Sequence, residues 1–225
     1  MAKNITVAVD GPAGSGKSSV CKAVAKDLSL KYIDSGAIYR TITLYCINKK
    51  MLAHIEEFSS CAFTEIDIRQ DFLSDGRCVT FLNGTDVSDA IRDETIVKYI
   101  GKVSDSVVVR EFVNTLLRKW AAEESVIMDG RDIGTVVFPN ADIKIYLDAS
   151  VDVRAQRRVN EYIKQKKNVD KKDVKNQIMQ RDEQDINRKY GALKMAEDAI
   201  YCDTSLMSQS QVVDYLKQLI KKNKV

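Results

Sequence analysis

Residues 11–18 read Gly-Pro-Ala-Gly-Ser-Gly-Lys-Ser and match the spacing G-x-x-x-x-G-K-S of a phosphate-binding loop. The glycines let the backbone turn until several N–H groups face one point, and Lys17 adds positive charge beside the start of a following helix. Ser18 offers a hydroxyl to a Mg²⁺ ion carried by a polyphosphate. The residues expected to bind the phosphates of a nucleotide are Gly11, Pro12, Ala13, Gly14, Ser15, Gly16, Lys17, Ser18 and Ser19.

A segment rich in glycine and serine can also be a simple turn. The residues on either side decide between a turn and a phosphate-binding loop. Residues 5–9, Ile-Thr-Val-Ala-Val, form a short apolar run that predicts a strand. Residues 19–28 repeat apolar side chains at helical spacing. A strand before the loop and a helix after it are the context that the pattern requires, which favours nucleotide binding.

A second stretch with chemical potential is residues 125–132, a predicted buried strand that ends in two carboxylates and an arginine. A carboxylate at the carboxyl end of a strand beside a phosphate loop can hold a water of Mg²⁺. Asp129 is therefore expected to assist the metal, through water, together with Ser18. The plainer interpretation of residues 129–132 is a polar turn with an Asp cap, which the glycine between the charges permits. Asp148, at the end of a second apolar strand over residues 143–148, is a rival for the metal role.

Arginines cluster in the last third of the chain. Ser150 is predicted to cap a helix in which Arg154, Arg157 and Arg158 stand at i, i+3 and i+4 and share a face. Three guanidinium groups on one face repel each other unless an anion joins them, so they are candidates for a lid over phosphates. Residues 164–168 then read as a solvated hinge.

A polar helix predicted over residues 171–189 brings Arg181, Asp185 and Arg188 to one face. An ion pair on a solvated helix is the default interpretation. Planar arginine side chains also suit bidentate contacts to phosphate, which favours a binding role.

Earlier in the chain, Ser35 and Arg40 flank the start of a helix that follows a short strand-like segment. An arginine beside the carboxyl end of a strand in an α/β sheet is well placed to meet a ligand. Arg110 lies near the start of a helix predicted over residues 107–122.

The remaining segments supply the frame. Alternating residues at about 63–87, with an Asn-Gly turn, predict a small antiparallel meander inserted into a chain that otherwise alternates strand and helix. One helix is predicted over residues 89–102. The chain closes with a strand at 199–203 and a helix over about 208–222, whose start carries a Ser-x-x-Gln capping box.

Composition limits the possible classes. The 225 residues, 44% of them hydrophobic, can bury one α/β core with a small insertion, and the net charge of +3 decides nothing about partners. The five cysteines lack C-x-x-C pairing, which predicts reduced thiols in the cytoplasm and no zinc site. No run is long enough for a signal peptide or a membrane helix. A Ser-His-Asp mechanism is not expected, because His54 is the single histidine.

Three stretches together resemble bacterial cytidylate kinases: residues 9–18, residues 34–40 (Asp-Ser-Gly-Ala-Ile-Tyr-Arg) and residues 129–139 (Asp-Gly-Arg-Asp-Ile-Gly-Thr-Val-Val-Phe-Pro). The similarity runs from near residue 4 to about 220, and the second and third stretches are far more specific than the loop. It implies a P-loop NTPase three-layer α/β sandwich with a five-stranded parallel sheet. It further implies a single domain over 1–225, with a core of 1–35, 111–150 and 189–225, a monophosphate-binding insertion at 36–110, and a lid with its following helix at 151–188.

The resemblance also implies a reaction in which ATP, with Mg²⁺, phosphorylates CMP or dCMP, and we expect a cytoplasmic monomer without nucleic-acid or membrane partners. The residues that resemble the monophosphate's partners are Ser35, Arg40, Arg131 and Arg188. Those that resemble readers of cytosine are Arg110 and Asp132, and the pair that resembles the sugar's partners is Arg181 and Asp185. The arginines expected to face ATP are Arg154, Arg157 and Arg158. The residues expected to act in catalysis are Lys17, Arg131, Arg154, Arg157 and Arg188.

One position departs from the family. Aligned without gaps between Arg92 and Arg110, the base-contacting serine of the family falls on Gly101, and Ser104 lies one helical turn later. Either Ser104 substitutes from the same face or one hydrogen bond to the base is missing. Both positions are therefore candidate substrate-binding residues.

Three other functions compete with this one. Another P-loop kinase would act on UMP, AMP or shikimate, but the second and third stretches favour CMP. A nucleotide-switched GTPase would need a guanine-reading Asn-Lys-x-Asp stretch, which the sequence lacks. Nucleic-acid binding by the basic residues 154–172 rests on charge alone.

Overall fold

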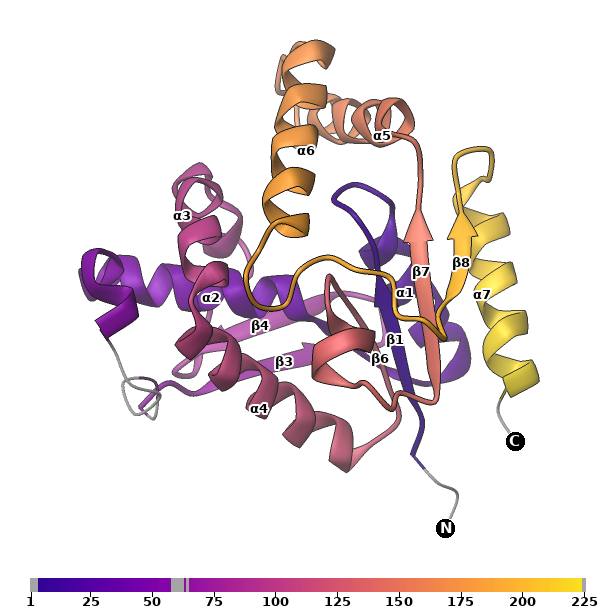
Figure 1. Ribbon diagram of the computed structural model, residues 1–225, viewed down its shortest axis with the longest axis horizontal. Coiled ribbons are helices and arrows are strands. Elements are labelled where there is room, and N and C mark those ends of the chain that lie inside the picture. The colour runs from indigo at the N-terminus through magenta and orange to yellow at the C-terminus, as the bar shows by residue number, and fades with distance from the viewer. Residues whose placement is uncertain (1–3, 58–62, 64, 224–225) are drawn as a thin grey trace.

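The computed structural model describes residues 4–57, 63 and 65–223. Its larger sheet has five strands, all parallel, in the order β2-β6-β1-β7-β8 (Figure 1), as the resemblance implied. The central strand β1 pairs with two strands that are remote in sequence. The loop after β1 therefore lies at the carboxyl ends of the strands, at the topological switch point where ligands bind in such sheets. The strands span Thr6–Asp10 (β1), Lys31–Asp34 (β2), Val126–Gly130 (β6), Ile143–Asp148 (β7) and Ile200–Asp203 (β8).

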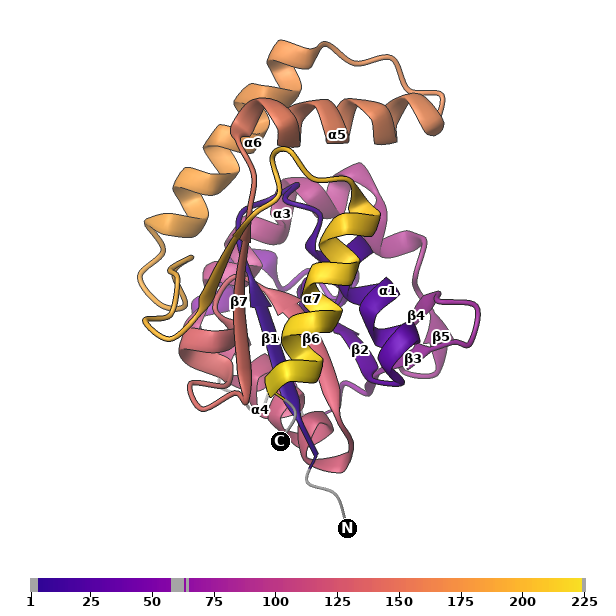
Figure 2. The same cartoon turned by 90° about the vertical axis from the view of Figure 1, so that its right-hand side faces the viewer.

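Helices cover both faces of this sheet (Figure 2). Four of them span Lys17–Leu28 (α1), Ser35–Asn48 (α2), Val107–Glu123 (α4) and Gln209–Asn223 (α7). Val7 and Val9 of β1 pack in one apolar cluster with α1 and α7, whereas Ala8 packs in another with α2 and α4. Because successive side chains of a strand point to opposite faces, a strand covered on both sides must be apolar throughout.

A second, antiparallel sheet follows α2 and a short 3₁₀ segment, Leu52–Glu57 (η1). Its strands are Ile68–Phe72 (β3), Cys78–Leu82 (β4) and Thr85–Asp86 (β5), which confirms the predicted meander. The side chain of Gln70 accepts a hydrogen bond from Asp34 N at 3.0 Å and donates one to Asp34 O at 2.9 Å. This buried amide fastens the small sheet to the carboxyl end of β2.

The single helix predicted over residues 89–102 is wrong. A 3₁₀ turn, Ala90–Arg92 (η3), precedes a separate helix, Glu94–Asp105 (α3). Asp93 between them has extended backbone angles, and its side chain accepts a hydrogen bond from Thr95 N at 2.8 Å. It therefore caps the start of α3 instead of continuing a helix.

Two further helices, Val151–Lys164 (α5) and Lys171–Ile186 (α6), pack on each other beyond the carboxyl edge of the large sheet (Figures 1 and 2). Ser150 Oγ accepts a hydrogen bond from Val153 N at 3.4 Å, so the predicted cap of α5 is confirmed. The predicted end of α6 near residue 189 is too late. The chain turns back at Ile186, and Leu193 N donates to Asp185 O at 2.7 Å.

Smaller expectations are also settled. Ser208 and Gln211 form the predicted capping box, with N–H to side-chain contacts of 2.8 and 3.3 Å. The four cysteines that the structure describes are free thiols, and Cys61 lies outside the described residues. Within the described chain, no helix has the length and apolar character needed to cross a membrane.

Candidate active site

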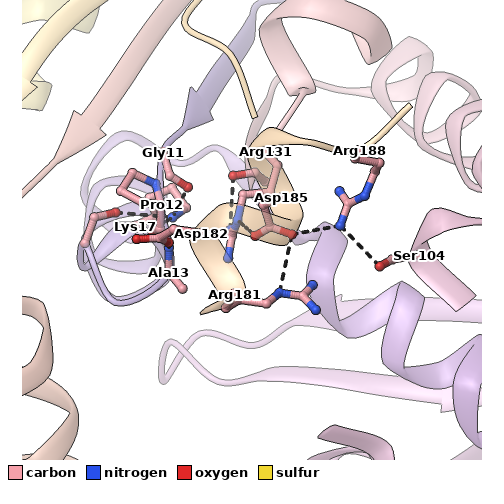
Figure 3. Close-up of polar contacts among 12 residues, drawn as sticks. Gly11, Pro12, Ala13, Lys17, Ser104, Arg131, Arg181, Asp182, Asp185 and Arg188 are labelled. Atoms are coloured by element: carbon pink, nitrogen blue, oxygen red, sulfur yellow. Dashed lines mark hydrogen bonds and ion pairs between the residues drawn. The ribbon is translucent and has the colours of Figure 1, made fainter. Parts of the chain in front are cut away.

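The phosphate loop wraps around the side chain of Lys17 (Figure 3). The buried Nζ of Lys17 donates to the backbone oxygens of Gly11 and Pro12, both at 2.7 Å, and to Ser15 Oγ at 3.2 Å. Gly11 has a φ of 148°, and a Cβ there would overlap the carbonyl oxygen of Leu147 in β7. The loop therefore needs glycine at this position to pass its neighbouring strand.

The start of α1 completes the loop. Gly16 occupies the N-cap in a left-handed conformation, and no side chain of the described residues caps the helix. The N–H groups of the first turn, at Lys17, Ser18 and Ser19, are therefore not taken by a capping side chain. Unused amides at a helix N-terminus form an anion site.

The charge of Lys17 is unfavourable in the protein without ligand. Burial, together with the charge of Arg131, lowers the pKa of Lys17 to about 7, although Asp129 and Asp10 oppose the shift. An ammonium group buried beside another cation gains most when an anion arrives. A bound anion would therefore offset the cost of burying the charge of Lys17.

Asp129 of β6 and Ser18 of α1 bring a carboxylate and a hydroxyl together beside the loop. Ser18 Oγ donates to Asp129 Oδ2 at 2.8 Å, and the hydroxyl of Tyr32 donates to Oδ1 at 2.7 Å. Burial, helped by the charge of Asp34, raises the pKa of Asp129. A hydroxyl beside a carboxylate suits Mg²⁺, which prefers oxygen ligands, so these residues fit the metal role expected of them.

Asp148, the rival carboxylate, is engaged elsewhere. Its Oδ1 accepts a hydrogen bond from Ala149 N at 2.7 Å, and its Oδ2 accepts one from the Tyr201 hydroxyl at 3.4 Å. Of the two rivals, Asp129 is the one in contact with the loop. The described residues contain no group of three or more acidic, histidine or cysteine side chains that could hold a metal.

Beside the loop, Asp185 gathers three arginines (Figure 3). Arg131 Nε donates to Asp185 Oδ2 at 2.7 Å, and Arg188 Nη2 donates to Oδ1 at 2.7 Å. Arg181 Nε lies 3.3 Å from Oδ1. Arg188 reaches the carboxylate from the segment that follows α6, so the face predicted for residues 181–188 is assembled partly outside the helix.

Positive charge is in excess around Asp185. Burial alone would raise the pKa of this carboxyl group, but the three arginines outweigh burial and hold the pKa below its usual value. Asp105 adds one more negative charge, 2.6 Å from Arg188. The cluster still carries more positive than negative groups, which favours a bound anion.

Arg110 and Asp132 form a buried ion pair. The guanidinium of Arg110 lies 5.3 and 6.0 Å from the ring centroids of Tyr39 and Tyr190, and its Nε has no hydrogen-bond partner among the described residues. Gly191 lies so close, with a φ of 67°, that a Cβ there would overlap both members of the pair. A buried pair with an unused donor beside flat rings is suited to a planar polar group such as a base.

Ser35 and Arg40 lie at the start of α2, as expected. Ser35 Oγ donates to the backbone oxygen of Asp129 at 2.6 Å. Arg40 Nη2 is 3.3 Å from Asp34, while its buried Nε is unpartnered among the residues described. The guanidinium thus keeps an unused donor for a ligand.

Gly101 and Ser104 lie on α3, on the side that faces α6. A Cβ at Gly101 would be 3.8 Å from Arg181 Nη1 and 3.9 Å from Gln184 Oε1, so there is room for a side chain. Ser104 Oγ donates to Gly101 O at 3.1 Å and accepts a weak contact from Arg188 Nη2 at 3.4 Å. The serine hydroxyl is therefore already engaged within the protein.

The three arginines of α5 do not act as one face. Arg154 and Arg157 each donate from Nη1 to a backbone oxygen of the phosphate loop at 3.0 Å. Arg158 pairs instead with Glu161 at 3.0 Å and lies 5.0 Å from the ring centroid of Tyr162. Side chains one turn along its own helix thus hold Arg158 away from the loop.

Sequence reasoning missed Asp10. Its carboxylate accepts hydrogen bonds from Ile133 N at 2.8 Å and Gly134 N at 2.7 Å, at the start of a π-helical turn, Ile133–Val137 (η4). Burial raises the pKa of Asp10 to about 6. Asp10 therefore links the segment that carries Arg131 to the strand that leads into the loop. The one sequence signal that could have indicated this role is a single carboxylate directly after an apolar run. Four other residues that contact the site residues were also not predicted: Tyr32, Tyr39, Tyr190 and Asp182.

Two groups of positively charged side chains therefore meet at the carboxyl edge of one parallel sheet. One half is the phosphate loop around Lys17, and the other is the arginine cluster on Asp185, with Arg131 between them. Positive groups that hold two phosphates side by side provide the positioning and charge neutralisation on which phosphoryl transfer depends. Fold and site together define a P-loop phosphotransferase.

Comparison with known proteins narrows the class to a family. The cytidylate kinase family model matches residues 7–222. The cytidylate kinase of Fusobacterium nucleatum is 40% identical over 98% of this chain and 99% of its own length. That of Caldanaerobacter subterraneus is 41% identical over 97% of this chain and 96% of its own length. The chain belongs to the cytidylate kinase family.

Solved structures support the fold. An uncharacterized protein from Eubacterium ventriosum matches with a TM-score of 0.52 over 98% of this chain and 99% of that chain. At 15% sequence identity, this likeness concerns the fold alone.

Proposed function

We propose that the protein transfers the γ-phosphoryl group of ATP to CMP or dCMP, giving ADP and CDP or dCDP. The observation that carries the proposal is that two positively charged groups lie side by side. One is Lys17 in its loop, and the other is the set of arginines that contact Asp185. Arg131 belongs to both, because it bonds to Asp185 and its charge lowers the pKa of Lys17. Membership of the cytidylate kinase family supports the same reaction.

The donor half is proposed to take ATP. The phosphates would lie in the loop over residues 11–19, under Arg154 and Arg157, whereas Arg158 would stay at the margin with Glu161. Ser18 and, through water, Asp129 would hold Mg²⁺, which offsets charge on the β- and γ-phosphates when it is bound.

The acceptor half is proposed to take the monophosphate. Its phosphate would be held by Ser35, Arg40, Arg131 and Arg188. Its sugar would meet Arg181 and Asp185. Because Ser104 is engaged with Gly101 and Arg188, recognition of the base would rest mainly on the pair of Arg110 and Asp132.

The chemistry needs little beyond positioning. The acceptor is already a phosphate anion, so no strong general base is required, which suits a site built from lysine and arginines. Closure of α5 and α6 over the loop would also exclude water and limit wasteful hydrolysis of ATP. We propose a cytoplasmic monomer, since one chain supplies both halves and the described thiols are free.

A coupled assay tests the proposal. Purified protein is mixed with ATP, Mg²⁺ and each of CMP, dCMP, UMP, AMP and shikimate in turn, and release of ADP is followed. CMP and dCMP are expected to give the highest rates. An absence of CMP-dependent ADP release would end the proposal, and salt-sensitive RNA binding in its place would favour nucleic-acid recognition.

Replacing Arg110 by methionine is expected to impair the use of CMP far more than the use of ATP. The change leaves Asp132 buried without its partner and removes the donors proposed for the base, so kcat/KM for CMP should fall at least about tenfold. KM for ATP should change less than about twofold. Arg92→Met, at an exposed site, is the control, and equal losses for both substrates would count against base recognition.

Binding of ADP at pH 8 is expected to take up close to one proton. The pKa of Lys17 is about 7 in the free protein, so its amine is mostly neutral at pH 8, and a bound polyphosphate favours the charged form and raises the pKa again. Binding enthalpies measured in buffers of different ionisation enthalpy give the number of protons. Lys17→Met should abolish the uptake, and proton release by the wild-type protein would contradict the assignment.

A further inference from the structure

A second carboxylate of α6, Asp182, lies at the phosphate loop (Figure 3). Its Oδ2 accepts a hydrogen bond from Arg154 Nη1 at 2.6 Å, and its Oδ1 accepts a longer one from Ala13 N at 3.3 Å. Arg154 Nη1 also donates to Ala13 O at 3.0 Å. Asp182, Arg154 and the loop thus form one closed set of contacts.

Arg154 is held in a single orientation. Its Nε donates to Ala149 O at 2.8 Å, and its side chain is only 5% exposed. In the part of the chain that the structure describes, Asp182 is the one carboxylate paired with Arg154, and Nη2 makes no hydrogen bond. A planar guanidinium with two nitrogens fixed presents the third in a defined direction.

We propose that Asp182 is a positioning residue of the donor half, which aims Arg154 at the phosphates of ATP. The inference rests on the proposed function, because it takes the polyphosphate of ATP as the ligand of the loop. A carboxylate near this site could instead repel or displace phosphate. The hydrogen bond from Arg154 to Asp182 is short and charge-assisted, whereas the one from Ala13 N is long, so Asp182 binds Arg154 more strongly than it blocks the loop amide. Positioning of Arg154 is therefore a larger effect than competition with phosphate.

The same helix orders the acceptor half. Asp185 follows Asp182 by three residues, so the two carboxylates lie about 4.5 Å apart along the axis of α6. One of them holds Arg154 and the other holds Arg131. Because transfer is sensitive to misplacement by about an ångström, one rigid helix that fixes both arginines would keep donor and acceptor in register.

A second ion pair between α5 and α6 supplies a matched control. Lys175 Nζ lies 2.7 Å from Asp152 Oδ1, and their side chains are 38% and 68% exposed. Within the described residues, neither side chain bonds to the phosphate loop. Asp152→Asn therefore removes a link between the same two helices and leaves Arg154 in place.

The test compares Asp182→Asn with Asp152→Asn by calorimetric binding of ADP and by steady-state kinetics. Asp182→Asn is expected to weaken ADP binding and raise KM for ATP about tenfold, with a similar fall in kcat. KM for CMP should stay within about twofold, which general loss of structure would not allow. Asp152→Asn should match the wild-type protein in every measurement.

Three results would overturn the inference: unchanged ADP affinity in Asp182→Asn, tighter ADP binding, or an equal rise of KM for both substrates. Tighter binding would show that Asp182 competes with phosphate. A wild-type protein that binds ADP but does not phosphorylate CMP would overturn the proposed function alone. In that case, the comparison of ADP affinities would still decide the role of Asp182.

Discussion

Replacing Lys17 by alanine is expected to lower the rate of CMP phosphorylation by about three orders of magnitude. The buried Nζ lies at the centre of the loop, 2.7 Å from two of its carbonyl oxygens, where no other lysine of the described chain takes part. It is the cation proposed to offset charge on the β- and γ-phosphates as they separate. Initial rates at saturating ATP and CMP measure the effect.

The melting temperature of Lys17→Ala distinguishes a loss of catalysis from a loss of folded protein. The pKa of Lys17 is about 7 in the folded protein and near 10.5 when exposed, so the folded state binds this proton less well and its charge costs stability below about pH 10. Lys17→Ala should therefore not lower the melting temperature at pH 7. Lys26→Ala, at an exposed position of the same helix, is the control. Turnover within about tenfold of wild type would remove Lys17 from the mechanism.

Replacing Arg131 by alanine is expected to lower kcat/KM for CMP by about two to three orders of magnitude. Arg131 donates a hydrogen bond to Asp185 at 2.7 Å, and its charge lowers the pKa of Lys17, so it lies between the two halves of the site. Its loss removes the cation that links the arginine cluster on Asp185 with Lys17. Rates measured over a range of CMP concentrations show how much of the loss falls on kcat and how much on KM.

The fold should survive this change. Asp185 keeps Arg188 at 2.7 Å and Arg181 at 3.3 Å, so its buried charge is not left without partners. Arg77→Ala is a matched control, since Arg77 is exposed and pairs only locally, with Asp75 at 2.7 Å. Wild-type kinetics in Arg131→Ala with an unchanged melting temperature would contradict the proposed site.

Elements set by local pattern could be predicted from the sequence. The strand before the loop, the meander and the caps at Ser150 and Ser208 each depend on a few neighbouring residues, and the structure confirms them. The end of α6 and the break at Asp93 depend on contacts that compete with helix formation, so periodicity alone placed them wrongly.

Contacts between distant residues could not be predicted in this way. Asp10 and Ile133 are 123 residues apart, and no spacing rule joins them. Arg158 shows a different limit, because spacing gives the face of a helix but not the partner that a long side chain selects. Glu161, one turn along, takes its guanidinium. Roles for Arg110 and Asp132 came from family resemblance rather than from pattern.

The hydrogen bonds of Asp10 have a consequence for ligands that would fill both halves at once. They join the segment of Arg131 directly to the strand that enters the loop, and β1 and β6 are paired along their whole lengths. The sheet therefore fixes the distance between the strand that enters the loop and the segment of Arg131, and α6 orients Arg154 and Arg131 within that frame. A single molecule in which adenosine and cytidine are joined by a chain of phosphates would have to span this distance, so its avidity is expected to be highest when the number of bridging phosphates matches it.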